Sequence, residues 1–164
     1  MSIPKKVLTH LEKSNTQHEV VDHKTVFTVY DLSQTLKEKM QNIAKSLLIK
    51  VDKEYKIVVI PSHYRLDLGK LKKFLNAKKI SIAKEKEMQT KFKVKPGGLS
   101  AFGGVYKVGV VADASLAKIQ KAIFHAGSFT QSVRMKVKDY MKLEDPITGR
   151  FVVKPVKAKP KKKK

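Results

Sequence analysis

A glycine-rich stretch in the second half of the chain is the segment best suited to hold a ligand against the backbone. Residues 95–104 read Lys-Pro-Gly-Gly-Leu-Ser-Ala-Phe-Gly-Gly. Glycine lets the main chain approach a bound group closely and turn its N–H groups toward it. Leu99 and Phe102 could add an apolar wall. The stretch is neither a Walker A loop nor a dinucleotide-binding fingerprint, because no helix is expected after it. It indicates either a plain connection or a binding loop.

A lysine inside an apolar run is the second feature with chemical potential. Lys45 interrupts residues 43–49, Ile-Ala-Lys-Ser-Leu-Leu-Ile, where one face of a strand should be buried. Its side chain either reaches solvent from the edge of a sheet or points into a pocket that holds an anion. The pattern alone favours neither alternative.

Several kinds of reaction centre are excluded or disfavoured. The chain has no cysteine, so a thiol nucleophile, a disulfide framework and a Cys-ligated metal are ruled out. The histidines lack i, i+4 pairing and carboxylate partners at ligand spacing, which predicts no metal site. Residues 98–102 fail the G-x-S-x-G pattern of a serine nucleophile. Any chemistry must therefore come from positioned backbone groups, one lysine and the substrate itself, with no cofactor.

The charge of the chain predicts a polyanionic partner. Lys and Arg number 36 against 14 Asp and Glu, for a formal charge of +22. Residues 154–164 hold seven of the lysines and no acid, so the remainder still carries about +15. Only three of the basic residues are arginines, and lysine contacts phosphate as a point charge rather than reading base edges. Nucleic acid contacted through its backbone is the predicted partner; the alternative is a compositional bias that places lysine on solvated faces.

The length suits one domain. We expect a single domain over residues 1–150 and a flexible lysine-rich tail over 151–164. The tail lysines expected to bind RNA are Lys157, Lys159, Lys161, Lys162, Lys163 and Lys164. No apolar run approaches the roughly 18 residues of a membrane span, and the N-terminus does not resemble a signal peptide. We expect a soluble, cytoplasmic protein.

The elements that must position the loop and the lysine alternate without strict β-α order. Expected helices follow Ser2-Ile3-Pro4, with Ser2 as the N-cap, and follow the caps Thr28 and Asp67. Further short helices are expected over 84–91 and 138–143. Expected strands cover residues 19–22, 43–51, 55–60, 80–82, 105–112, 121–126 and 132–137, with the second and third paired as a hairpin. The predicted class is α+β, a mixed sheet flanked by helices.

From about His18 to Leu143 the chain resembles the YbaK/prolyl-tRNA synthetase-associated editing domains, which are free-standing aminoacyl-tRNA deacylases. Family members share a His, a Thr-capped helix, an Ala-Lys-Thr/Ser-Leu strand, a Pro-Gly-Gly-x-Ser-Pro-Phe-Gly loop, a strand ending in Asp and an Ala-Gly pair. The matching positions are His23, Thr28, 44–47, 96–103, 110–113 and 126–128. One departure concerns the loop, where the family's proline is Ala101. The resemblance implies a partly barrel-like mixed sheet.

The resemblance also implies an activity and a set of site residues. The reaction would be hydrolysis of the ester between a small amino acid, such as Ala, Cys, Ser or Pro, and the terminal ribose of a mischarged tRNA. The residues implied in catalysis are Lys45, Gly97, Gly98, Leu99, Ser100 and Ala101. Those implied in substrate binding are His23, Thr28, Leu47, Phe102, Gly103, Asp113, Gly127 and Ser128. The implied partners are tRNA and an aminoacyl-tRNA synthetase.

Two other classes of function fit the same residues. The first is a non-catalytic RNA- or ribosome-binding protein that keeps the fold. Ala101 and the surplus of lysines favour it. The second is a regulatory module that binds an amino-acid ester or a nucleotide in the same pocket. Hydrolysis of a mischarged tRNA distinguishes the editing enzyme from both.

Overall fold

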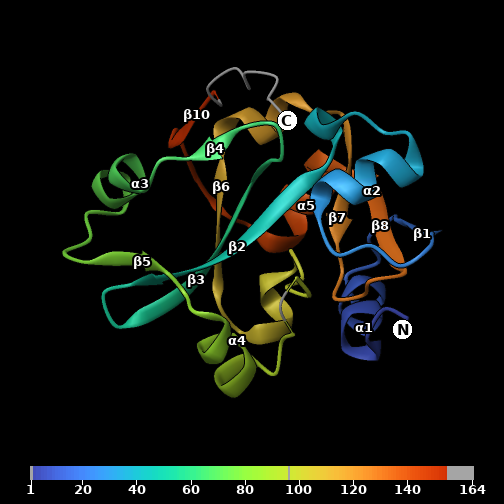
Figure 1. Ribbon diagram of the computed structural model, residues 1–164, viewed down its shortest axis with the longest axis horizontal. Helices are drawn as coiled ribbons and strands as arrows, with labels where there is room; N and C mark the ends of the chain where they lie inside the picture. The colour runs from blue at the N-terminus through green and yellow to red at the C-terminus, as the bar shows by residue number, and fades with distance from the viewer. Residues whose placement is uncertain (1, 96, 155–164) are drawn as a thin grey trace, which may run out of the picture.

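A five-stranded mixed sheet forms the frame of the protein (Figure 1). The structure, a computed structural model, describes residues 2–95 and 97–154. The strand order is β5-β2-β3-β6-β9. Its strands are β2 (Ala44–Val51), β3 (Glu54–Pro61), β5 (Ile80–Ile82), β6 (Gly109–Asp113) and β9 (Ile147–Gly149). The β2–β3 and β2–β5 pairs are antiparallel, whereas β6 runs parallel to both β3 and β9, so the predicted hairpin and mixed sheet are confirmed.

A second sheet of three antiparallel strands lies beside the first. Its order is β1-β8-β7, with β1 spanning Glu19–Asp22, β7 spanning Lys121–His125 and β8 spanning Gln131–Lys136. A parallel bridge between Ile43 and Ile123 connects the start of β2 to β7, which makes the whole β structure partly barrel-like. A third, two-stranded sheet pairs β4 (Arg65–Leu66) with β10 (Val152–Val153).

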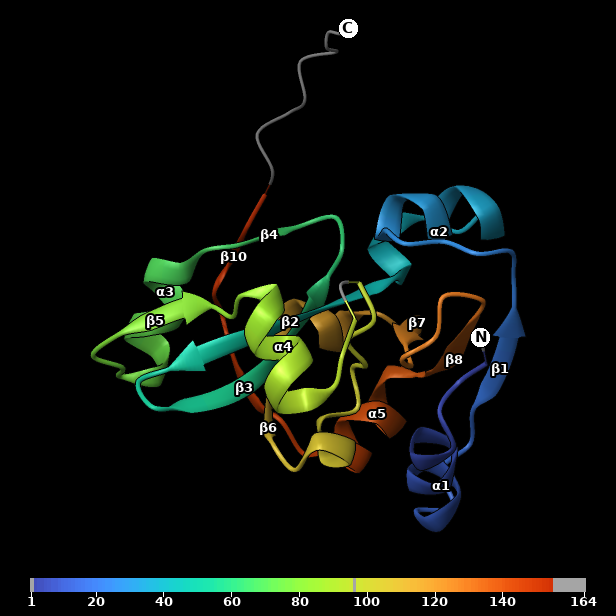
Figure 2. The same ribbon diagram turned by 60° about the horizontal axis from the view of Figure 1, so that its bottom comes forward.

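The helices cover the outer surfaces of these sheets. They are α1 (Lys5–Lys13), α2 (Val29–Leu36), α3 (Leu68–Leu75), α4 (Glu85–Phe92) and α5 (Val137–Glu144), with short 3-10 helices η1 (Met40–Asn42), η2 (Gly103–Tyr106) and η3 (Ala114–Lys118). In Figures 1 and 2, α1 lies near β1 and β8, and α3 lies at the far side of the molecule near β5. In the described part of the chain no helix is long and apolar enough to cross a membrane.

The central strands are buried on both faces, as expected where helices or a second sheet cover each side. In β3, Ile57 and Val59 pack into the core between the two sheets, while Val58 and Ile60 pack into a second core with Leu71 of α3. Alternate side chains of one strand therefore serve two different cores. This arrangement holds the strand rigidly and fixes the register of β2, which carries Lys45.

Local sequence signals explain most element boundaries. Thr28 and Asp67 cap α2 and α3 as predicted, since each side chain accepts a hydrogen bond from the N–H three residues later. The predicted Ser2 cap is wrong, because Pro4 precedes α1 and no side chain caps that helix.

The expected strand over 105–112 is wrong in its first half. Residues Gly103–Tyr106 form η2, which ends at Lys107 in the left-handed conformation, and the strand starts only at Gly109.

The folded domain extends past the expected boundary at residue 150. Phe151 is fully buried against α3 and β6, and Val152–Val153 form β10. Asp113 explains this attachment. Its side chain, only 2% exposed, accepts hydrogen bonds from the Phe151 N–H at 2.8 Å and from the N–H and hydroxyl of Ser115. Asp113 therefore fastens the C-terminal segment to β6. The expected tail lysines, from Lys157 onward, lie outside the described residues.

Replacing Asp113 should destabilise the protein without a direct effect on ligand binding. Asp113→Ala removes the acceptor for three donors and leaves the buried Phe151 N–H unpaired, so the free energy of unfolding should fall by about 2–3 kcal/mol. Urea unfolding followed by circular dichroism measures the loss. The control is Asp139→Ala on α5, whose carboxylate has no hydrogen bond to a described residue and should change stability by about 0.5 kcal/mol or less. Equal effects of the two variants would contradict the assignment.

Candidate functional site

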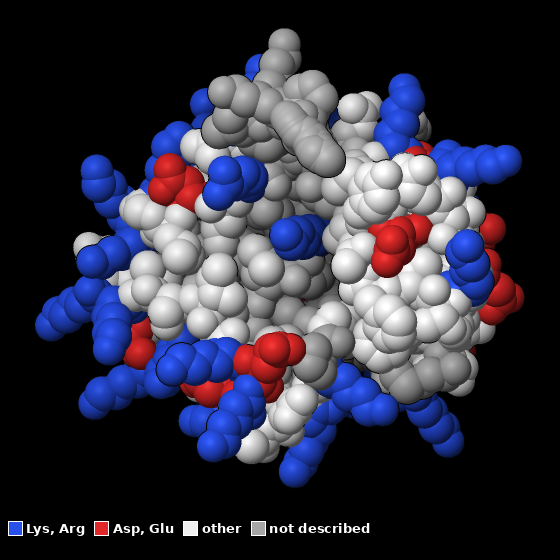
Figure 3. All heavy atoms as spheres, viewed as in Figure 1, with Lys and Arg blue, Asp and Glu red and all other residues white. Residues whose placement is uncertain are grey.

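A pocket of about 510 Å³ opens between the start of β2, the segment leading into α2, the β5–α4 connection and the turn between β7 and β8. Figure 3 shows a hollow in this part of the surface, bordered mostly by uncharged atoms. Its walls are largely aliphatic, with Val26, Leu32, Ile43, Leu48 and Met88 among them. No carboxylate lines it among the described residues, so its electrostatic character comes from cations and dipoles.

Lys45 is the cation of this pocket. It lies on β2 opposite Ile60 of β3, lines the pocket and remains exposed to solvent. It forms no ion pair with any carboxylate in the described part of the chain. Lys45 thus has features of both alternatives that the sequence left open, since it lines a pocket and is also open to solvent. The adjacent Ser46 also lines the pocket, and its buried Oγ has no hydrogen-bond partner among the described residues.

The glycine loop contributes less than its composition suggests. Most of its N–H groups are already used within the protein. The N–H of Gly98 donates to Lys95 O, that of Ser100 to the Tyr106 hydroxyl, that of Ala101 to His125 O and that of Phe102 to Ser100 Oγ. Of the loop residues that the structure describes, Gly97 and Leu99 alone line the pocket. Their N–H groups have no hydrogen-bond partner among the described residues, so they remain available to a ligand.

Gly97 adopts a conformation that favours glycine. Its φ is +79°, and a Cβ atom there would lie 3.1 Å from the carbonyl oxygen of Phe27. A side chain would be both strained and crowded against the segment that leads into α2. The glycine therefore permits close contact between the loop and the α2 side of the pocket.

His125, at the end of β7, fixes the loop from the opposite side. Its Nδ1 accepts the Gly127 N–H at 3.0 Å, and its ring also hydrogen-bonds the backbone of Gly97. Burial lowers the pKa of His125 to about 4, helped by the nearby His23 and only partly offset by the hydrogen bond to Gly97. The ring is therefore neutral at physiological pH, and its Nδ1 is occupied by the Gly127 N–H. It acts as a positioning residue for Gly97.

Comparison with known proteins places this site in a family. The family model described as "Aminoacyl-tRNA editing domain" matches residues 23–143, most of the chain. This chain belongs to the aminoacyl-tRNA editing domain family. The matched region contains Lys45, the glycine loop and His125, the three parts of the pocket described above.

Curated relatives of this editing domain include larger and similar-sized proteins. It is 28% identical over 113 residues to the proline–tRNA ligase of Macrococcus caseolyticus (strain JCSC5402), covering 67% of this chain and 20% of the ligase. It is 24% identical over 149 residues to the prolyl-tRNA editing protein ProX of Acetoanaerobium sticklandii, covering 87% of this chain and 91% of that protein. The chain thus spans about a fifth of the ligase and nearly all of ProX.

Solved structures share the fold of this editing domain. The hypothetical protein APE2540 superposes with a TM-score of 0.82 at 16% identity, covering 90% of this chain and 99% of that one. A candidate trans-editing enzyme for prolyl tRNA synthetase superposes with a TM-score of 0.79 at 19% identity, covering 90% and 94%. At these identities the likeness shows the mixed α+β fold.

The editing-domain pocket includes some of the expected site residues and leaves others out. Lys45, Gly97, Leu99, Thr28, Leu47 and Ser128 line it. His23 does not line it directly, but its Nε2 lies 2.9 Å from the hydroxyl of Ser132, which does.

Six of the expected residues have structural positions instead. Phe102 is fully buried among Phe124 and Tyr140, and Gly103 is closed in by Val110. The other members of this group, Gly98, Ser100, Ala101 and Asp113, are buried and do not line the pocket. A seventh expected residue, Gly127, also lies outside the pocket lining, packs against the ring of Pro4 and supports His125. Each of these residues holds the loop or the core instead of lining the pocket. Their expected roles in catalysis or substrate binding stay predictions.

Several pocket residues escaped the sequence analysis. Phe27 and Tyr30 line the mouth with side chains 63% and 61% exposed, which is unusual for aromatic residues. Phe27 lies 5.0 Å from the ring of Phe129, in a tilted arrangement. In the sequence, Phe27 and Tyr30 lie on either side of the Thr28 helix cap, and this position was the one signal that could have predicted them as pocket residues. His125 and Ser132 gave no signal, since only the fold brings β7 and β8 to the pocket. No cluster of metal-binding side chains occurs in the described part of the chain.

The departure at Ala101 has a structural meaning. Its N–H donates to His125 O at 2.8 Å, a bond that the proline typical of the family cannot make. Ala101→Pro should therefore lower the free energy of unfolding by about 1–3 kcal/mol, since the buried carbonyl of His125 loses its donor. Thermal and urea unfolding measure this. Ala101→Ser keeps the N–H and is the matched control. A proline variant as stable as the wild type would disprove the importance of this hydrogen bond.

The buried His125 should make stability depend on pH. Between pH 6.5 and about 4 the unfolded chain binds a proton at this residue and the native state does not. Its contribution is therefore complete above pH 6.5 and is lost as the pH falls toward 4, by at most about 3 kcal/mol. Urea unfolding of wild type and His125→Asn between pH 7 and 4 tests this. The stability advantage of the wild type should shrink on acidification; parallel curves would contradict it.

Proposed function

We propose that this protein hydrolyses the ester bond between a wrongly attached amino acid and the 3′-terminal ribose of a tRNA. The observation that carries the proposal is the pocket itself: an apolar chamber without carboxylates, with one unpaired lysine and two free N–H groups, inside a domain of the aminoacyl-tRNA editing family. Its volume of about 510 Å³ lies within the range of roughly 300–1,000 Å³ typical of small-molecule sites.

The chemistry required matches what the pocket offers. An aminoacyl ester is already activated, so the protein must hold it, exclude bulky side chains and stabilise the charge that forms on the carbonyl oxygen as water attacks. The N–H groups of Gly97 and Leu99 are the proposed donors to that oxygen, and His125 holds Gly97 in place. Lys45 would pair with the terminal phosphate. Because no carboxylate lines the described part of the pocket and Nδ1 of His125 already accepts the Gly127 N–H, removal of the proton from water is assigned to a group of the substrate.

The terminal nucleoside would be held at the mouth of the pocket. Phe27 and Tyr30 present exposed aromatic faces there, and stacking of a base on such a ring contributes about 1–3 kcal/mol. The buried, unpartnered Oγ of Ser46 is available to a polar group of the substrate.

The amino acid removed would be small, with alanine, cysteine, serine and proline as candidates. The sequence similarity to ProX and to proline–tRNA ligase favours a tRNA that is charged by a prolyl-tRNA synthetase. That synthetase would also be the natural partner protein, and the cytoplasm the expected compartment.

Lys45→Ala tests the assignment most directly. Without the cation that holds the terminal phosphate, release of the amino acid from a mischarged tRNA should fall by at least about a hundredfold in kcat/KM, the loss of one charge-assisted contact in a partly desolvated site. The measurement is a deacylation panel of tRNAs carrying alanine, cysteine, serine or proline. Lys118→Ala, an exposed lysine on η3, is the matched control. Wild-type rates in Lys45→Ala would overturn the role of Lys45.

A non-catalytic RNA-binding function is the second candidate. The observation that favours it is that four N–H groups of the glycine loop are already bonded inside the protein, which leaves few donors for an oxyanion. Absence of hydrolysis for every aminoacyl-tRNA in the panel, together with RNA binding that weakens steeply with salt, would favour it over the deacylase.

A further inference from the structure

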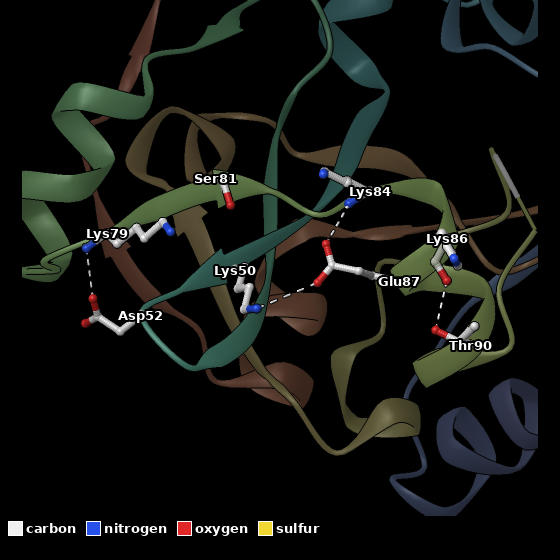
Figure 4. Close-up of a pocket in the computed structure, with 8 residues that line it drawn as sticks. All are labelled: Lys50, Asp52, Lys79, Ser81, Lys84, Lys86, Glu87 and Thr90. Atoms are coloured by element: carbon white, nitrogen blue, oxygen red, sulfur yellow. Dashed lines mark hydrogen bonds and ion pairs between the residues drawn. The ribbon is translucent and has the colours of Figure 1, made fainter.

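A second cleft, of about 570 Å³, lies beside the β5–α4 connection (Figure 4). Four lysines from three segments line it: Lys50 on β2, Lys79 just before β5, and Lys84 and Lys86 at the start of α4. We call the cleft that these four lysines line the lysine groove. Among the described residues no arginine and no aromatic side chain lines it, so it has the character of a site for phosphate groups rather than for bases.

The two acidic residues in the groove are already used by the protein. Asp52 Oδ1 accepts the N–H groups of Lys78 and Lys79, both at 2.9 Å. Glu87 accepts the Lys84 N–H and the Tyr55 hydroxyl and pairs with Lys50 at 3.9 Å, as Figure 4 shows for the two lysine contacts.

The hydrogen bond from the Tyr55 hydroxyl, more than any other contact, lowers the pKa of Glu87. Glu87 therefore stays ionised and keeps its contacts with Tyr55 and Lys84. Lys79, Lys84 and Lys86 have no carboxylate partner in the described part of the chain, so three cations remain uncompensated.

The groove and the substrate pocket share one wall. Ser81 of β5 faces the groove, whereas its neighbour Ile82 lines the pocket, as expected for alternating side chains of a strand. In the following residues Lys84 and Lys86 line the groove, while Ala83 and Met88 line the pocket. A polymer that places its end in the pocket therefore has the lysine groove directly beside it. On the face in Figure 3, lysine and arginine side chains gather along the rim over α3, β5 and α4.

We propose that the lysine groove binds the phosphate backbone of the tRNA strand that ends in the pocket, independently of its base sequence. This inference rests on the proposed function, which supplies the strand end. Phosphates next to the terminal nucleotide lie against Lys79, Lys84 and Lys86, and Lys45 contacts the last one inside the pocket. Uncompensated lysines without arginine give affinity without base reading.

The experiment compares two triple variants of equal charge. Lys79→Ala/Lys84→Ala/Lys86→Ala removes the free cations of the groove, and Lys118→Ala/Lys138→Ala/Lys142→Ala removes three exposed lysines from η3 and α5. Binding of a fluorescein-labelled, uncharged tRNA is measured by anisotropy at several salt concentrations. The groove variant should bind about tenfold more weakly or worse, and the slope of log K against log salt should fall by about 3, one unit for each phosphate contact. Circular dichroism and thermal unfolding confirm that both variants fold.

Kinetics separate the groove from the pocket. With mischarged tRNA the groove variant should show a raised KM and an unchanged kcat. With a minimal ester, an aminoacyl-adenosine that lacks the neighbouring phosphates, it should match the wild type. The control variant should match the wild type with both substrates.

Each result decides between the proposals. Equal losses of affinity in the two triple variants would show a general charge effect and overturn the groove. An unchanged slope in the groove variant, with deacylation intact, would overturn the groove alone. If the wild type hydrolyses no ester but the groove variant still loses affinity and slope, the groove stands as an RNA site and the deacylase proposal fails. A groove variant that loses activity equally on the minimal ester would place these lysines in the pocket and contradict the inference.

Discussion

The pocket depends on two hydrogen bonds that the buried backbone of Ala101 makes, one through its N–H and one through its carbonyl oxygen. Its N–H donates to the carbonyl of His125 on β7, and its carbonyl accepts the hydroxyl of Tyr140 on α5 at 2.5 Å. Tyr140 in turn stacks on Phe124, with ring centroids 4.2 Å apart. The glycine loop is therefore fastened at its centre to a strand and to a helix, both part of the main core. Only with this anchor can Gly97 and Leu99 present their N–H groups at a fixed place, because the neighbouring glycines impose little conformation of their own.

The same anchor explains why most of the loop is unavailable for chemistry. A segment rich in glycine has many N–H groups, but a buried loop must satisfy nearly all of them internally. Here Ser100, buried and outside the pocket, donates its N–H to the Tyr106 hydroxyl and accepts the Phe102 N–H with its Oγ. The donors left over are those nearest the pocket. Under the proposed function, two such preorganised N–H groups would stabilise developing charge without having to reorient.

Sequence reasoning reached the frame of the fold, because it follows from local patterns, but it left open whether Lys45 faces a pocket or the edge of a sheet. The strands, the caps at Thr28 and Asp67 and the family resemblance depend on short stretches of residues. Phe102, Gly103 and Asp113 were expected to bind substrate but do not line the pocket, for a common reason. A motif shows which residues recur together, but burial decides which of them reach the ligand and which support the others. Tertiary packing alone brings His125, Phe27 and Tyr30 to the site. Strand β10 forms because Asp113 binds the backbone of Phe151, and these two residues are too far apart in the sequence for a local pattern to predict the contact.

The thin wall between the pocket and the lysine groove has a mechanical consequence. The side chains of Ser81 and Ile82 belong to one three-residue strand that is paired to β2 at Ile49–Val51, and α4 begins three residues after Ile82. A displacement of this strand that widens the chamber narrows the cleft on its other side. Under the two proposals above, the pocket selects the amino acid and the groove binds the RNA backbone, so a substitution in β5 that alters one of these sites also alters the other.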